Sequence, residues 1–153
     1  MKIQILQVAR SKDKNILALE EEFEKRLRPF MQLESITVAA SKSDEREKSR
    51  KEESQLLLKK LDSDAHIIAM DERGSQLSSE AFADLVREQR DHGPGRIQFI
   101  IGGSNGLHET VLAKAHATLS LSKMTFTHEM VRVFLKEQLY RAATILAGKR
   151  YHK

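Results

Sequence analysis

The sequence has no cysteine among its 153 residues, which excludes disulfide bonds and thiolate metal ligands. No apolar run approaches the roughly 20 residues that cross a bilayer, and Met1–Gln4 lead directly into a strand-like pattern instead of a signal peptide. We therefore expect a cytoplasmic protein without a membrane partner. The 40% hydrophobic and 31% charged residues are typical of a globular protein, and the length suits one domain with its own core.

The positive charge is concentrated at the C-terminal end. The formal net charge is +4, whereas residues 123–153 hold seven Lys or Arg and two acidic residues, a sum of +5, so residues 1–122 sum to −1. The chain ends in Lys-Arg-Tyr-His-Lys over Lys149–Lys153. A cationic end suits a polyanion such as a phosphate backbone, and a solvated tail is the alternative interpretation.

Apolar residues alternate between strand spacing and helix spacing along the whole chain. The spacing predicts strands over 2–9, 33–40, 65–70, 96–101 and 117–121. It predicts helices over 13–28, 43–61, from Ser78 or Ser79 onward, 107–114 and 128–147, the last one capped by Gly148. The charged first half of 43–61 is expected to be a solvated face. Strands separated by helices pair in parallel, so the sequence predicts one α/β domain with a Rossmann-like parallel sheet and helices on both faces.

Three predicted loops each follow a strand: Met70–Gly74, Gly102–Gly106 and Ser122–Thr127. Ligands on open α/β sheets bind at the carboxyl ends of the strands. If the three preceding strands are neighbours, the loops therefore form one pocket. We expect the first loop to be a turn in which Asp71 accepts hydrogen bonds that fix the loop.

The glycine loop, Gly-Gly-Ser-Asn-Gly over Gly102–Gly106, is open to several interpretations. Its spacing does not match the G-x-G-x-x-G fingerprint of dinucleotide sites. It does match the G-x-S-x-G nucleophile elbow of hydrolases around Ser104, where Glu137 and His152 would have to complete the triad. It also suits a loop whose main chain lines a ligand, or a plain turn. The two neighbouring loops favour the ligand loop.

Three histidines, His108, His116 and His128, lie close together in the sequence, but their spacings of eight and twelve match no helical pair of metal ligands. No metal site is therefore predicted, and His116 is expected at the surface or in a pocket wall. Glu137 and Arg141 are four residues apart, which predicts a structural pair on a helix.

Ordered motifs in the last third of the chain are more specific than any of these patterns. They are Phe99–Leu107, Leu119–His128, Val131–Val133, Glu137–Ala142 and the terminal Tyr151–Lys153. Together they closely resemble the ribosomal large-subunit (23S rRNA) pseudouridine N3-methyltransferase family, the H member of the large-subunit rRNA methyltransferases, in the SPOUT or α/β-knot superfamily. The resemblance extends over the whole chain and is most specific from Phe99 onward.

The resemblance implies a single SPOUT domain over residues 1–153, with a C-terminal trefoil knot and the cofactor site within about residues 99–153. Members of the family are homodimers that use S-adenosyl-L-methionine to methylate N3 of a pseudouridine in large-subunit rRNA. They act once ribosome assembly is essentially complete. The alternative interpretation is a non-catalytic α/β module that binds the ribosome or another RNA.

By matching position, the resemblance implies cofactor contacts made mostly by main-chain groups. These fall at Met70, Gly102, Leu121, Ser122, Lys123, Met124, Thr125 and Phe126. Many members have Leu in place of Met70, which is a tolerable apolar change. Many also have Pro in place of Thr127, so the loop before His128 is expected to be less rigid here.

Four residues are candidates for catalysis: His128, Arg132, Tyr151 and His152. The N3–H of a pyrimidine imide is a weak acid, so methyl transfer needs a base or a group that stabilises the anion. His128 is interpreted as that base, as a donor that orients it, or as a helix N-cap, and a helix N-terminus lowers a histidine pKa. Arg132 contacts a phosphate or a base, or else forms a surface salt bridge. The resemblance implies that Tyr151 and His152 lie over the cofactor pocket of the partner subunit.

Overall fold

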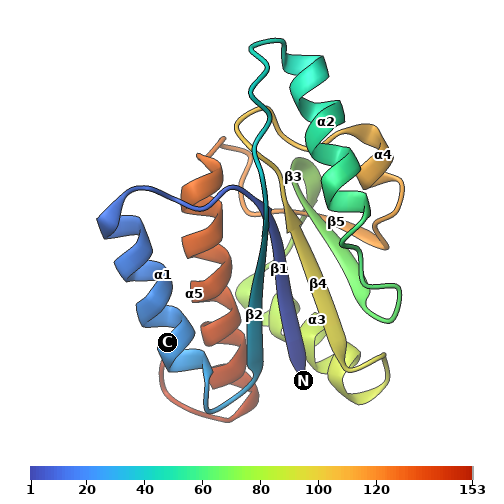
Figure 1. Cartoon of the computed structure of the whole chain (residues 1–153). Helices are drawn as coiled ribbons and strands as arrows, with labels where there is room; N and C mark the ends of the chain where they lie inside the picture. The colour runs from blue at the N-terminus through green and yellow to red at the C-terminus, as the bar shows by residue number, and fades with distance from the viewer. Residues whose placement is uncertain (153) are drawn as a thin grey trace.

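The computed structural model describes residues 1–152 and contains a five-stranded parallel sheet with helices on both faces (Figure 1). The elements in chain order are β1 (Lys2–Val8), α1 (Lys14–Leu27), β2 (Gln32–Val38), α2 (Arg46–Leu58), β3 (His66–Gln76), α3 (Ser79–Asp91), β4 (Arg96–Ile101), α4 (Glu109–Leu112), β5 (Ala117–Ser120) and α5 (His128–Leu146). The strand order is β2-β1-β4-β3-β5, and each neighbouring pair is parallel. The predicted α/β class and parallel sheet are confirmed.

Two apolar clusters cover the two faces of the sheet. The larger cluster includes Phe82 of α3, Phe99 of β4 and Leu135 of α5. The smaller cluster includes Leu57 of α2 and Ile100 of β4. Successive side chains of a strand point to opposite faces, so the neighbouring residues Phe99 and Ile100 of β4 supply different clusters.

α5 spans 19 residues and packs against α1 and α3. The Thr127 hydroxyl caps its start by accepting a hydrogen bond from the Met130 N–H at 3.3 Å. At its end Gly148 has a φ of +65°, and the Lys149 N–H donates to the Thr144 carbonyl at 2.8 Å, as in a Schellman motif. The predicted cap at Gly148 is confirmed, and the first turn of α5 lies at the carboxyl edge of the sheet.

A buried ion pair joins α5 to α1. The Lys136 side chain is 2% exposed, and its Nζ lies 2.7 Å from Glu20 and 2.6 Å from Glu24. An ammonium group buried without a partner destabilises a fold by several kcal/mol, on the order of 3–5. The pairing therefore fixes how α1 is placed along α5.

β3 differs from the prediction, which ended the strand at Met70 and placed a turn at 71–74. The strand continues to Gln76. Met70 and Ser75 both pair with Leu119, so residues 71–74 bulge out of the ladder between them. A Cβ at Gly74 would lie 2.7 Å from the carbonyl carbon of Thr118, which excludes a side chain there. The bulge keeps β3 paired with β5 and still carries Asp71 away from the sheet.

The remaining differences are at element ends. α2 begins at Arg46 instead of residue 43, and α4 covers only Glu109–Leu112 instead of 107–114. Within residues 1–152 none of the helices combines the length and the apolar character that crossing a membrane requires. The trefoil knot stays a prediction of the resemblance, and Lys153 lies outside the described residues.

Candidate functional site

A cavity of about 770 Å³ lies at the carboxyl ends of β4, β3 and β5. β3 is the neighbour of both other strands, so the three loops that follow them meet as predicted. Seven of the eight predicted cofactor residues lie in the cavity wall: Met70, Gly102, Leu121, Ser122, Met124, Thr125 and Phe126. Lys123 is not part of the wall. The cofactor role of these residues stays a prediction, but their gathering in one place is a property of the fold.

The glycine loop forms a tight turn on one side of the cavity. The Gly106 N–H donates to the Gly103 carbonyl at 3.0 Å, and Gly106 has a φ of +78°. A Cβ at Gly102 would lie 2.7 Å from the carbonyl carbon of Gly106. Side chains are therefore excluded at Gly102 and strained at Gly106, and the loop presents main chain to the cavity.

The hydrolase interpretation of this loop has no triad. The Glu137 carboxylate is paired with Arg141 at 2.5 Å, and the His152 Nε2 lies 2.6 Å from Glu80. Both groups are therefore engaged elsewhere, and neither contacts Ser104. The predicted pair between Glu137 and Arg141 is confirmed.

The bulge at 71–74 is held by its own side chains. The Asp71 carboxylate accepts hydrogen bonds from the Arg73 N–H at 2.9 Å and from the Arg73 guanidinium at 3.0 and 3.1 Å. These bonds lower the pKa of Asp71, so the predicted role of this residue in fixing the loop is confirmed. Glu72 accepts a hydrogen bond from the Thr125 hydroxyl at 2.7 Å. This bond links the bulge to the loop after β5, and both residues line the cavity.

The first half of α2 is not only a solvated face, because Arg46 and Arg50 line the cavity. The Arg50 guanidinium donates to the Leu107 carbonyl at 2.6 Å and pairs with Glu109 at 3.0 Å and with Glu47 at 3.1 Å. These contacts hold α2 against the exit of the glycine loop. Sequence reasoning missed them because Arg50 and Leu107 are 57 residues apart.

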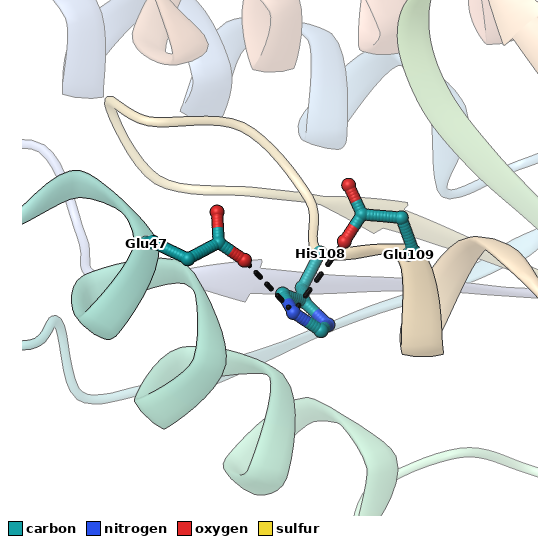
Figure 2. Close-up of side chains that lie close together, drawn as sticks. All are labelled: Glu47, His108 and Glu109. Atoms are coloured by element: carbon teal, nitrogen blue, oxygen red, sulfur yellow. Dashed lines mark ion pairs between the residues drawn. The ribbon is translucent and has the colours of Figure 1, made fainter.

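Figure 2 shows His108 between the carboxylates of Glu47 and Glu109. Its Nε2 lies 3.1 Å from the Glu47 carboxylate and 3.4 Å from the Glu109 carboxylate. These three residues are the one group in residues 1–152 with the spacing of a metal site. However, His108 Nδ1 accepts a hydrogen bond from the Thr110 N–H at 3.2 Å, so a neutral ring carries its proton on Nε2. Nε2 then donates to the carboxylates, and Arg50 balances their charge. The group is an ion-pair network that joins α2 to α4.

His116 lies far from this network. Its ring stacks on His66 with a centroid distance of 5.1 Å, and its Nδ1 accepts a hydrogen bond from the Ile67 N–H at 2.9 Å. It is partly exposed and lines a shallow depression near Arg96, at the amino ends of β3 and β4. The expectation for His116 is confirmed.

His128 lies in the cavity wall, half-buried, at the first residue of α5. Thr127 is the N-cap, so the N-cap interpretation of His128 is wrong. Burial lowers the pKa of His128, and the positive charge of Arg132 lowers it further, while Glu129 and Glu53 oppose the shift. The ring is therefore neutral at neutral pH and able to accept a proton.

Arg132 lies behind His128 and is 1% exposed, so its interpretation as a surface salt bridge is wrong. Its Nη1 donates to the Ala9 carbonyl at 2.5 Å. Its Nε and Nη2 are buried and have no hydrogen-bond partner among residues 1–152. Arg132 is not part of the cavity wall, so within this chain it acts on His128 through its charge.

Tyr151 and His152 lie away from the cavity of their own chain. The Tyr151 ring packs on Tyr140 with a centroid distance of 4.7 Å, and its hydroxyl lies 3.2 Å from Glu137. His152 contacts Glu80 in the first turn of α3. The four candidate catalytic residues thus lie in three places. His128 lines the cavity, Arg132 is buried one helical turn after it, and Tyr151 and His152 lie along the second half of α5.

Comparison with known proteins decides the family. A family model described as predicted SPOUT methyltransferase matches residues 1–152. This chain belongs to the SPOUT methyltransferase family. It is 42% identical over 159 residues to the ribosomal RNA large subunit methyltransferase H of Clostridium botulinum (strain Kyoto / Type A2), and the match covers 100% of both chains. The resemblance drawn from the sequence motifs is confirmed.

Solved structures share the SPOUT methyltransferase fold. A probable methylase family protein from Haemophilus influenzae Rd KW20 has a TM-score of 0.58 and 18% identity, covering 99% of this chain and 70% of that one. The SpoU methyltransferase AviRb from Streptomyces viridochromogenes, solved with AdoMet, has a TM-score of 0.50 and 11% identity, covering 96% of this chain and 58% of that one. This likeness shows that the fold of the chain is a known one.

We expect an NMR titration of the His128 ring to give a pKa below the ordinary value of about 6.5. Arg132→Gln should raise this pKa, because it removes a neighbouring positive charge, whereas Arg132→Lys should keep it low. Because the pKa is lowered on folding, the unfolded chain binds more protons than the folded chain at acidic pH. The contribution of His128 to stability is therefore fully present above about pH 6.5, the unfolded value, and it is lost as the pH falls through the folded-state pKa. A pKa at or above 6.5 in the folded protein would contradict the described burial.

Proposed function

We propose that this SPOUT methyltransferase transfers the methyl group of S-adenosylmethionine to N3 of a pseudouridine in large-subunit (23S) rRNA. The observation that carries the proposal is the 42% identity, over the full length of both chains, to a large-subunit rRNA methyltransferase H. The substrate is the assembled ribosome, and the reaction takes place in the cytoplasm. Two features of the cavity support the proposal: its charge and the state of His128.

The cavity suits a cationic cofactor. Its wall carries three arginines and four acidic residues, a formal sum of −1: Arg46, Arg50, Arg73, Asp71, Glu72, Glu109 and Glu129. S-adenosylmethionine carries a sulfonium charge in addition to its amino-acid zwitterion, so its net charge is positive. The volume of about 770 Å³ lies within the range of small-molecule sites, about 300–1,000 Å³. The main chain of Gly102–Gly106 and Leu121–Phe126 would hold the cofactor, which supplies an electrophilic methyl group.

His128 is the base in this proposal. The methyl acceptor must lose its N3 proton, and a neutral imidazole in the cavity wall can take it. Burial and Arg132 keep the ring neutral. Arg132 therefore acts as a positioning residue that sets the proton affinity of His128. A purely RNA-binding module would need neither a cavity of this size nor a neutral histidine in its wall.

The tail is proposed to act on the partner subunit of a homodimer. Tyr151 contacts Glu137 of α5. Glu137 is nine residues after His128, so the two residues are about 14 Å apart along the helix axis. The tail of a chain therefore lies well away from the cavity of that same chain. A second copy that brings its tail to this cavity would supply Tyr151 and His152 to the substrate.

An exposed apolar surface next to the cavity supports the dimer. Leu77 is 42% exposed, Phe126 38% and Met124 75%. Leu77 and Phe126 border a second depression with Phe134 and Ser79. The tail attaches beside it, because His152 contacts Glu80. Apolar patches of this kind on the surface of a single chain mark protein interfaces.

We expect purified wild-type protein to add one methyl group to ribosomes from a strain that lacks the enzyme, mapped by mass spectrometry to N3 of a pseudouridine in 23S rRNA. His128→Gln should lower kcat about 100-fold or more and leave the affinity for S-adenosylmethionine unchanged. The wild-type rate should rise with pH through a pKa below 6.5, and the variant should lose this limb. His92→Gln, at an exposed site at the end of α3, is the control and should keep full activity. Methylation at another atom would overturn the substrate, and an unchanged kcat in His128→Gln would overturn the base.

The dimer predicts complementation between two inactive variants. A chain that lacks residues 151–153 should bind S-adenosylmethionine normally and transfer no methyl group, and His128→Gln should also be inactive. Co-expression of the two should restore up to about a quarter of wild-type activity, because half of the dimers are mixed and each holds one complete site. If the mixed dimers stay inactive, the tail acts within its own chain.

A further inference from the structure

The loop between β1 and α1 contains an unusual backbone conformation. Ala9 has a φ of +57°, the one residue other than glycine with a positive φ in residues 1–152. Alanine in this left-handed region is strained by about 1 kcal/mol or more. Such strain persists only where the surroundings enforce it, so the contacts of this loop indicate what it is held in place to do.

Two side chains of α5 hold the loop. Arg132 donates to the Ala9 carbonyl at 2.5 Å, and Glu129 accepts a hydrogen bond from the hydroxyl of buried Ser11 at 2.6 Å. Glu129 and His128 line the cavity in the same helical turn. The loop and this wall of the cavity are therefore one connected unit, and Figure 1 shows both at the same end of the sheet.

The loop presents two free cations to solvent. Ser11 points inward, so Arg10 and Lys12 on either side of it are exposed. Neither is within ion-pair distance of an acidic group among residues 1–152, whereas Arg50, Arg73 and Lys136 are all paired. The nearby Asp13 carboxylate is engaged in capping α1, where it accepts the Asn15 N–H at 2.7 Å. Arg10 and Lys12 are thus held, unpaired, next to the cavity.

We propose that the β1–α1 loop is an RNA-binding element in which Arg10 and Lys12 bind backbone phosphates of the rRNA beside the target nucleotide. The inference rests on the proposed function. Cations on a rigid loop bind phosphate with a smaller loss of conformational entropy than cations on a flexible tail. The loop serves the cavity of its own chain, while the basic tail Lys149–His152 lies along the second half of α5. The RNA is therefore held from two sides, by this loop and by the tail of the partner.

The test compares two double variants that remove the same charge. Arg10→Ala/Lys12→Ala should weaken binding to ribosomes from a strain lacking the enzyme on the order of tenfold. It should also reduce the slope of log affinity against log monovalent salt by about two, at fixed magnesium. KM for ribosomes should rise, while kcat at saturation and the affinity for S-adenosylmethionine stay at wild-type values. Lys59→Ala/Lys60→Ala, at exposed positions after α2 on the opposite edge, should behave as wild type.

Each outcome has one meaning. Unchanged affinity in Arg10→Ala/Lys12→Ala overturns the proposal, and so does weaker binding with an unchanged salt slope, because phosphate contacts must appear in that slope. Equal losses in both double variants also overturn it, since the effect then reflects net charge alone. If the wild-type protein neither binds nor methylates ribosomes, the proposed function itself fails. If the wild type methylates and the loop variant matches it, only the loop proposal fails.

Discussion

β3 pairs in parallel with β4 on one side and with β5 on the other, and the site depends on this arrangement. Because all three strands point the same way, the bulge of β3, the glycine loop and the loop after β5 meet at one edge. The bulge at 71–74 has two consequences at this edge. Ser75 pairs with Leu119 after the bulge, and Glu72 within the bulge accepts a hydrogen bond from the Thr125 hydroxyl.

The two ends of α5 contact different parts of the molecule, the cavity at its start and the C-terminal tail along its second half. Its first turn supplies His128 to the cavity wall, and its second half holds the tail through Glu137. The buried pair between Lys136 and Glu20 fixes the middle of the helix against α1. Arg132 connects the start of α5 to the end of β1, and together with Glu129 it joins the cavity wall to the β1–α1 loop. In the proposed homodimer, the first turn of α5 would serve the cavity of its own chain and the tail would serve the cavity of the partner.

Most of the fold followed from local pattern, because alternating periodicity determines which segments are strands and which are helices. Local pattern could not give the continuation of β3 past Met70, since the bulge depends on pairing with Leu119 nearly 50 residues later. It also could not give the burial of Arg132, which depends on a left-handed turn at Ala9, 123 residues away in the sequence. The cavity wall was predicted well because most of its residues lie in or next to three short loops that each follow a strand. The arginines of α2 were missed because they resemble any charged helix surface.

In the proposed function, the cavity at the carboxyl edge of the sheet binds S-adenosylmethionine. Isothermal titration of the purified wild-type protein with S-adenosylmethionine, and with its demethylated product, tests this claim without any assumption about the RNA. We expect saturable binding with at most one ligand per chain. The absence of detectable binding at millimolar ligand would show that the cavity is not a site for S-adenosylmethionine.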